Sequence, residues 1–135
     1  MTFVSRQQVR FAHVDAAGIV FYPRYFEMLN AAVEDYFAEA VGVDFKEIHL
    51  QRRLAVPTVK LESEFSAPSR LGDQLDFHLD IPRVGRSSAG VDVEVRCQNQ
   101  LRFKAKVVLV CMDLDSGRSL AWPGDMRPSE TQAAT

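Results

Sequence analysis

The sequence predicts a single α+β domain in which a five-stranded antiparallel sheet wraps around one long central helix. Three observations lead to this prediction. The chain has 135 residues, of which 47% are hydrophobic, and this is enough to fill one core. Apolar residues recur at helical spacing in one long segment. Apolar and polar residues alternate, as in strands, in one segment before that helix and in four segments after it.

The first expected strand covers residues 3–15. Its second half alternates most cleanly, and the odd positions carry Val9, Phe11, His13 and Asp15. Because successive side chains of a strand point to opposite faces, these four would share one face. The apolar face of this strand would therefore end in two polar groups.

A long helix is expected after a turn at Gly18, where small residues favour a close backbone approach. Pro23 suits the first helical position, and Gly42 supplies a stop signal. The apolar residues that recur at steps of three and four are Tyr25, Phe26, Leu29, Val33, Tyr36, Phe37 and Ala40. One side of this helix should pack on a large apolar surface.

Four further strands are expected beyond a polar connection near residues 46–53, with breaks at 68–73, 85–90 and 98–100. Each strand has one apolar face and should bury it; in the first of them this face consists of Val59, Leu61 and Phe65. The last segment, 126–135, is polar and rich in small residues, which predicts disorder. The domain is therefore expected to cover residues 1–125.

Composition narrows the possible partners. Charged residues make up 25% of the chain and the net charge is −2, so we expect no binding to nucleic acid or to anionic membranes. No signal-like segment or apolar run of about 20 residues is present, which predicts a soluble cytoplasmic protein. Cys97 and Cys111 are expected as buried, reduced thiols, and the scattered histidines His13, His49 and His78 do not predict a metal site.

Residues 9–26, VRFAHVDAAGIVFYPRYF, resemble the N-terminal signature of the 4-hydroxybenzoyl-CoA thioesterase family. In that signature an aspartate precedes a small residue, Ala-Gly, an apolar pair, an aromatic pair and a residue that starts a helix. The resemblance extends more loosely from residue 3 to about 125, through Val56-Pro57-Thr58-Val59 and Leu71-Gly72-Asp73. It implies the hotdog fold and a homodimer or homotetramer with active sites at the dimer interface. It also implies an acyl-CoA or aryl-CoA substrate and no separate cofactor, since coenzyme A is part of the substrate.

Hydrolysis of a thioester needs a nucleophile or general base at the carbonyl carbon and a hydrogen-bond donor at the oxygen. The resemblance implies that Asp15 is the catalytic carboxylate, which either attacks directly or activates water; the alternative is a turn aspartate. Because Pro23 has no N–H, the backbone N–H of Tyr22 is the favoured oxyanion donor at the helix start. His13 either orients the carboxylate or a water, or is simply a hydrogen-bonded histidine.

The phosphates of coenzyme A require a local basic cluster. Arg83 and Arg86, on either side of a turn, are the candidates because the resembled family has a basic cluster near this region. The alternative patch consists of Arg102, Lys104 and Lys106. The sequence leaves open an aryl or a short- to medium-chain acyl group, a carrier-protein thioester in place of CoA, and a module that binds acyl-CoA without turnover. A hydratase is disfavoured because no hydratase-like motif is found.

Overall fold

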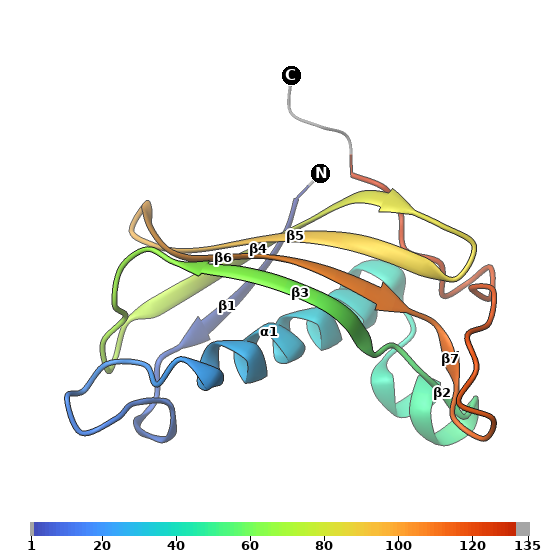
Figure 1. Cartoon of the computed structure of the whole chain (residues 1–135), viewed down its shortest axis with the longest axis horizontal. Helices are drawn as coiled ribbons and strands as arrows, with labels where there is room; N and C mark the ends of the chain where they lie inside the picture. Colours follow the sequence, from blue (N-terminus) through green and yellow to red (C-terminus); the bar gives the residue numbers. More distant parts are fainter. Residues whose placement is uncertain (1, 132–135) are drawn as a thin grey trace.

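The computed structural model describes residues 2–131, which form one layered domain (Figure 1). Five strands make an antiparallel sheet in the order β1-β4-β5-β6-β3, and β2 and β7 form a second, two-stranded sheet. The large sheet curls around α1, so the predicted hotdog fold is confirmed. The elements in chain order are β1 (Phe3–Gln8), η1 (Phe11–His13), α1 (Pro23–Tyr36), η2 (Phe37–Val41), η3 (Glu47–Gln51), β2 (Leu54–Ala55), β3 (Thr58–Phe65), β4 (Gln74–Val84), β5 (Ser88–Cys97), β6 (Gln100–Val110) and β7 (Met112–Asp113).

The core lies between α1 and the concave face of the sheet. Pro23 is the first residue of α1, as expected, and Gly42 ends the following π-helical turn with a φ of +92°. Ala40, which was predicted on the apolar stripe, is exposed, because the wider π-helical turn rotates the residues after Tyr36. The buried residues of α1 are Tyr25, Met28, Leu29, Ala32, Val33 and Tyr36.

Strands β4, β5 and β6 bury alternate residues as predicted. Gln98 and Asn99, with φ of +50° and +67°, join β5 to β6 in a two-residue turn whose backbone matches the twist of a hairpin. The thiols of Cys97 and Cys111 are buried and unpaired. The inward-facing residues are Leu75, Phe77, Leu79, Ile81, Val91, Val93, Val95, Cys97, Phe103, Ala105, Val107 and Leu109.

The expected first strand is too long, because β1 ends at Gln8. Gln8 pairs with Gln74, the first residue of β4, so the chain beyond it has no neighbouring strand. Residues 11–13 form a 3-10 turn instead, and Phe11 is 82% exposed. The prediction that His13 and Asp15 continue the apolar face of a strand is therefore wrong.

Strand β3 also differs from expectation. It lies at the edge of the sheet, and its apolar residues Val59, Leu61 and Phe65 are exposed rather than buried. Leu61 and Phe65 point to the same face as the buried Val107 and Phe103 of β6. Phe65 is partly covered by the rings of Tyr22 and Phe26, yet half of its surface stays exposed. The apolar pattern of β3 is thus correct, whereas its predicted burial in the single chain is wrong.

The polar C-terminal segment is held against the sheet over the part that the structure describes. Met126 is fully buried, and the N–H of Thr131 donates to Ile81 O at 2.8 Å. The Ile81 N–H donates in turn to the Thr131 hydroxyl at 2.8 Å. Disorder from residue 126 onward is therefore wrong for 126–131, and residues 132–135 lie outside the described part. Within residues 2–131, no helix is long and apolar enough to cross a membrane.

Candidate active site

Asp15 lies at the start of a tight turn. Its N–H donates to Ile19 O and its carbonyl oxygen accepts from the Gly18 N–H, each at 2.9 Å. Gly18 has a φ of +76°, which only glycine adopts without strain. One carboxylate oxygen of Asp15 accepts from the Ala17 N–H at 2.8 Å, and the side chain is exposed. The aspartate therefore shapes its own turn and also presents its carboxylate to solvent.

The start of α1 lies directly beside this turn. The Phe21 N–H donates to His13 O at 2.9 Å, and the Arg24 N–H donates to Phe21 O at 2.8 Å. Pro23 has no N–H. In the chain as described, no acceptor is found for the N–H of Tyr22. This N–H is oriented by a helical backbone conformation, with φ −52° and ψ −35°, and remains available at the positive end of the helix dipole.

His13 has a local structural role. Its Nδ1 accepts the Arg10 N–H at 2.8 Å, which closes the 3-10 turn and leaves Nε2 as the protonated nitrogen of the neutral ring. The carbonyl of the same residue holds Phe21, as described above. The arrangement therefore supports the interpretation of His13 as a hydrogen-bonded structural histidine. Its carbonyl oxygen, and not its side chain, contacts the segment at the start of α1.

A loop between β3 and β4 braces the Asp15 turn from behind. The Val20 N–H donates to Ser69 O at 2.8 Å, and the Leu71 N–H donates to Gly18 O at 3.1 Å. The hydroxyl of Ser69 is buried, and it accepts a 2.9 Å hydrogen bond from the phenol of Tyr25. Burial raises the pKa of Tyr25, so the phenol stays protonated as this donor.

Arg102 ties this loop together. Its guanidinium donates to Pro68 O at 3.0 Å, to Ser69 Oγ at 3.3 Å and to Asp73 Oδ2 at 2.8 Å. Burial opposes ionisation of Asp73, but hydrogen bonds from the Arg70 N–H and from Arg102, together with the charge of Arg102, outweigh it and lower the pKa of this carboxyl. Arg102 thus supports the loop and is not free to bind a phosphate.

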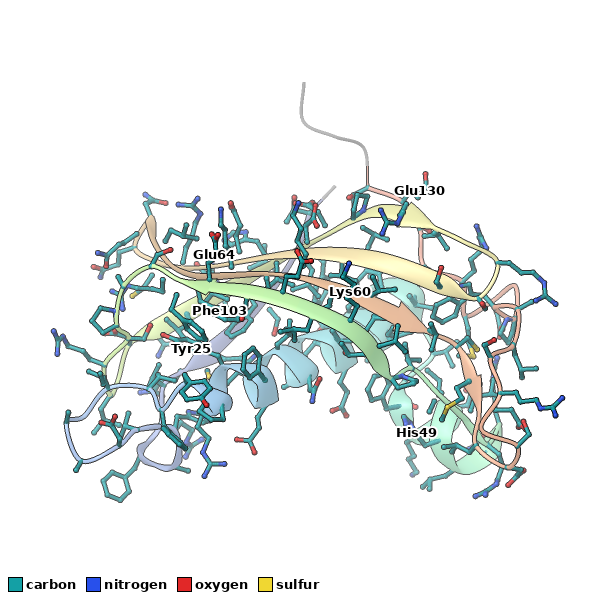
Figure 2. All side chains as sticks on the ribbon, in the orientation of Figure 1. Tyr25, His49, Lys60, Glu64, Phe103 and Glu130 are labelled. Carbon is teal, nitrogen blue, oxygen red and sulfur yellow. The ribbon has the colours of Figure 1, made fainter. Side chains whose placement is uncertain are left out.

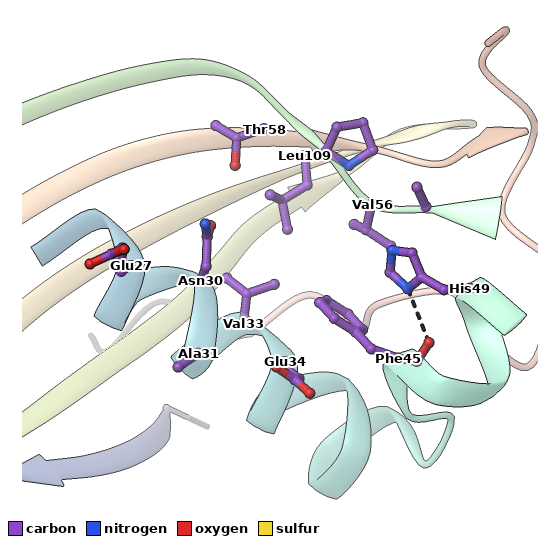
Figure 3. Close-up of a pocket in the computed structure, with 12 residues that line it drawn as sticks. Glu27, Asn30, Ala31, Val33, Glu34, Phe45, His49, Val56, Thr58 and Leu109 are labelled. Atoms are coloured by element: carbon purple, nitrogen blue, oxygen red, sulfur yellow. Dashed lines mark hydrogen bonds between the residues drawn. The ribbon is translucent and has the colours of Figure 1, made fainter. Parts of the chain in front are cut away.

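A cavity of about 530 Å³ opens beneath the start of β3 (Figure 3). Its apolar walls come from α1, β6 and the segment between β2 and β3, and its polar groups include His49 and Thr58. The volume lies within the range of about 300–1,000 Å³ that is typical of ligand sites. The lining residues are Glu27, Asn30, Ala31, Val33, Glu34, Phe45, His49, Ala55, Val56, Pro57, Thr58 and Leu109.

Asp15 and this cavity lie at opposite ends of β3 in one chain. The ring of Tyr22 packs against Phe65, the last residue of β3, with centroids 6.0 Å apart, whereas Thr58, the first residue of β3, lines the cavity. Seven residue steps of a strand separate these positions by roughly 23 Å. Figure 2 shows the same separation, with Tyr25 near one end of the molecule and His49 near the other.

Arg83 and Arg86 flank Gly85 at the β4–β5 turn, which lies at the same end of the sheet as the cavity, because Val84 pairs with Ala89 and Ala89 pairs with Leu109 of the cavity wall. The stem of Arg83 passes over Gly90, where an added Cβ would meet Arg83 Cγ at 3.4 Å. Arg127 joins them by donating to Gly85 O at 2.9 Å and to Val84 O at 3.2 Å. Arg127 could not be predicted as part of this group, because the polar C-terminal segment carries no pattern that reveals its contacts.

The alternative basic patch is neutralised by its neighbours. Lys104 lies opposite Glu64 and Lys106 opposite Glu62 in the β3–β6 register, and the Lys104 ammonium is 3.3 Å from the Glu64 carboxylate. On the β5 side, Glu94 and Asp92 lie opposite the same two lysines. This outer face of the sheet is therefore a poorer phosphate site than the β4–β5 turn.

The five-stranded antiparallel sheet wrapped around α1 places the protein in the hotdog class. The chain belongs to the thioesterase-like superfamily, whose family model matches residues 9–129. This confirms the resemblance at the level of the superfamily. Among the residues described, no group of three His, Cys, Asp or Glu side chains is placed to hold a metal ion.

Several relatives and structural neighbours are named as hydrolases of CoA thioesters. A 1,4-dihydroxy-2-naphthoyl-CoA hydrolase from Nostoc punctiforme is 27% identical over 126 residues, which is 93% of this chain and 84% of the relative. The crystal structure of a 1,4-dihydroxy-2-naphthoyl-CoA thioesterase from Synechocystis matches with a TM-score of 0.82 and 26% identity over 93% of this chain and 92% of that one. A gentisyl-coenzyme A thioesterase matches with a TM-score of 0.84 and 23% identity over 91% of this chain and 98% of that one, a similarity of fold.

Proposed function

We propose that this protein hydrolyses an aryl-CoA thioester to the free acid and coenzyme A. The observation that carries the proposal is that the exposed Asp15 carboxylate and the available N–H of Tyr22 lie on one short, hydrogen-bonded segment. The hydrogen bond from the Phe21 N–H to His13 O brings their segments together. The relatives that hydrolyse 1,4-dihydroxy-2-naphthoyl-CoA support an aryl acyl group.

In the proposed reaction, the thioester oxygen accepts a hydrogen bond from Tyr22 N–H and gains negative charge as the carbonyl carbon is attacked. Asp15 either attacks this carbon, forming a mixed anhydride that water then hydrolyses, or removes a proton from the attacking water. In both routes the C–S bond breaks and the sulfur leaves as the CoA thiolate, which takes up a proton. Both routes use the same carboxylate and the same donor.

The exposed edge of β3 supports a homodimer as the active form. An edge strand with free N–H and C=O groups and exposed apolar side chains is a template for pairing with another chain. A two-fold axis through this edge would pair β3 with the partner's β3 in antiparallel fashion, and would cover Val59, Leu61 and Phe65.

This pairing also completes the site. An antiparallel match of two copies of β3 places the Phe65 end of one beside the Thr58 end of the other. The Asp15 turn, next to Phe65, then lies near the partner's cavity, which begins at Thr58. The proposed substrate has its carbonyl held by one subunit and its acyl group enclosed by the other.

The coenzyme A phosphates would be met by the same partner. The β4–β5 turn lies at the cavity end of the sheet, because Val84 pairs with Ala89, which pairs in turn with Leu109 of the cavity. We therefore assign the phosphates to Arg83 and Arg86, with Arg127 beside them. Charge-assisted hydrogen bonds from arginine suit phosphate groups at such a turn.

The test is thiol release from benzoyl-CoA, hydroxybenzoyl-CoA isomers, 1,4-dihydroxy-2-naphthoyl-CoA and aliphatic acyl-CoA thioesters. Asp15→Asn should lose at least about 10²-fold in kcat, whereas Asp92→Asn, on the outer sheet face, should keep the activity of the wild type. Both variants must keep the melting temperature and oligomeric state of the wild type. Binding of all thioesters without thiol release would favour a non-catalytic acyl-CoA-binding module. Faster thiol release from acyl-carrier-protein thioesters than from acyl-CoA thioesters would show that the leaving group is the carrier-protein thiol and not CoA.

A further inference from the structure

His49 has a defined orientation inside the cavity. It lies on η3, and its Nδ1 is 3.0 Å from the carbonyl oxygen of Phe45. Because a carbonyl oxygen only accepts, Nδ1 carries the proton in this hydrogen bond. In the neutral ring, Nε2 is then the acceptor. Figure 3 shows this second nitrogen on the side of the ring that faces Val56, a neighbour in the cavity wall.

The surroundings of His49 are apolar close to the ring and acidic at the rim. Val33, Val56 and Leu109 are buried residues of the cavity wall, and the ring of Phe45 lies 5.2 Å from the imidazole. A flat aromatic group would fit among such side chains. His49 therefore presents a single oriented acceptor within a mainly apolar part of the cavity.

The other ionisable groups that line the cavity are carboxylates. Glu27 and Glu34 project from α1 at its rim, and Glu27 is paired with Arg24 at 2.8 Å. Glutamate carboxylates and the His49 Nε2 are all hydrogen-bond acceptors. Asn30 and Thr58, the other polar groups of the lining, can each donate or accept a hydrogen bond. A ligand group that both donates and accepts is therefore matched here, and a ligand carboxylate would be repelled by Glu27 and Glu34. A hydroxyl group on an aromatic ring meets both conditions.

We propose that His49 of one subunit accepts a hydrogen bond from a hydroxyl group on the acyl portion of the substrate, whose carbonyl is held by the partner's Asp15 and Tyr22. This inference rests on the proposed function and names the residue that selects hydroxylated over unsubstituted aryl groups. The dimer argument places the acyl group in the cavity from the Thr58 side, and His49 lies beyond Thr58, on the helical segment that precedes β2. His49 thus meets the ring at a point remote from the thioester.

The expected effect is on selectivity. Loss of a hydrogen bond between the partly buried His49 and a substrate hydroxyl should cost about tenfold in kcat/KM for the substrate that carries the hydroxyl. The unsubstituted aryl thioester makes no such bond, so its kcat/KM should change by no more than about twofold. A merely structural histidine would affect both substrates equally.

The test compares kcat/KM for the hydroxybenzoyl-CoA isomers and 1,4-dihydroxy-2-naphthoyl-CoA with that for benzoyl-CoA. His49→Phe keeps a ring against Phe45 but removes the acceptor, and His49→Gln restores an amide oxygen. His78→Phe, on β4, is the matched control. We expect the preference for the best hydroxylated substrate to fall about tenfold in His49→Phe, to recover in part in His49→Gln, and to be unchanged in His78→Phe. Equal loss for both substrates would overturn the role of His49.

A binding measurement separates this inference from the proposed function. Calorimetric titration of the same thioesters into Asp15→Asn and into the Asp15→Asn/His49→Phe double variant reports the hydroxyl preference without turnover. If the wild type hydrolyses none of the thioesters, the proposed function fails. The role of His49 is then still supported if Asp15→Asn binds hydroxylated thioesters with a lower Kd than unsubstituted ones and the double variant does not. If the preference in Kd is the same in both variants, His49 does not recognise the hydroxyl.

Discussion

The carbonyl oxygen of His13 accepts a hydrogen bond from the N–H of Phe21 at 2.9 Å. This single bond closes the Asp15 turn against the start of α1. It uses the N–H of Phe21, and because Pro23 has none, the N–H of Tyr22 is left at the helix start. A carboxylate and a backbone donor are thereby held on one short segment, and their spacing depends on the shape of the turn.

The turn should be sensitive to Gly18→Ala. With φ at +76° and nothing within 4 Å of the added Cβ, the change acts through backbone strain, which costs about 1–2 kcal/mol. We expect a lower free energy of unfolding in urea and a lower kcat with little change in KM. Gly117→Ala is the matched control, since Gly117 has φ +73° and the same open surroundings. An equal fall in kcat in both variants would contradict the role of this turn.

The brace behind the turn predicts a pH-dependent stability. The pKa of Asp73 is lowered in the folded protein, so its carboxylate stabilises the fold above its unfolded pKa, and this contribution is lost as the pH falls through the folded pKa. Asp73→Asn should reduce the free energy of unfolding by about 1 kcal/mol at pH 7. In urea titrations the difference from the wild type should shrink below the ordinary aspartate pKa near 3.8. A difference that stays constant down to pH 3 would show that the charge of Asp73 is not its source.

The edge of β3 predicts that Leu61→Lys yields monomers. Leu61 is 39% exposed in the single chain, and a charge there would be buried in the proposed dimer without a partner. Light scattering should show half the wild-type mass, and thioesterase activity should be lost while the far-ultraviolet circular dichroism is kept. Leu120→Lys is the control, because Leu120 is 40% exposed but lies outside β3. A Leu61→Lys dimer with full activity would exclude this interface.

Mixed dimers test whether the site is shared. Chains with Asp15→Asn and chains with His49→Phe, purified together through two affinity tags, would form one site that has both Asp15 and His49. That site should hydrolyse hydroxylated substrates with the selectivity of the wild type at about half its rate per dimer. If Asp15 and His49 acted within one chain, the only site with Asp15 would lack His49, and the mixed dimer would show the low selectivity of His49→Phe.

The phosphate assignment predicts a salt-dependent effect on KM. Arg83→Gln and Arg86→Gln should each raise KM for an aryl-CoA about 2- to 5-fold, since exposed charge pairs contribute up to about 1 kcal/mol. The effect should diminish at high ionic strength. Lys104→Gln/Lys106→Gln is the matched control and should leave KM unchanged, because acidic residues surround both lysines. A larger rise in KM in the lysine variant than in the arginine variants would indicate that the CoA phosphates bind on the outer face of the sheet.

Most of the fold could be predicted from the sequence because the buried elements repeat with a clear period. The inward residues Phe77 of β4 and Val93 of β5, and Leu29 of α1, each sit in a run whose spacing indicates the element and its buried side. The end of β1 could not be predicted, since alternation continues to Phe11 although the partner strand begins at Gln74. Pairing depends on the neighbouring strand, which local periodicity does not describe.

Of the two parts of the candidate site, Asp15 with Tyr22 could be predicted from the sequence, whereas the cavity around His49 could not. Asp15 and Tyr22 belong to one continuous motif, so their proximity follows from a short turn and a helix start. The cavity around His49 joins α1, η3 and β3, and nothing in the local sequence of His49 distinguishes it from a solvated histidine. The exposed apolar face of β3 shows a similar limit, because on the proposed arrangement it meets a second chain.

The separation of Asp15 from the cavity along β3 has a kinetic consequence. On the proposed arrangement a single chain holds halves of two different sites, and a monomer carries no complete one. Specific activity would then fall on dilution below the dissociation constant of the dimer, with a rate that varies as the square of the chain concentration. Newly synthesised chains would therefore be inactive as monomers and would gain activity when they dimerise.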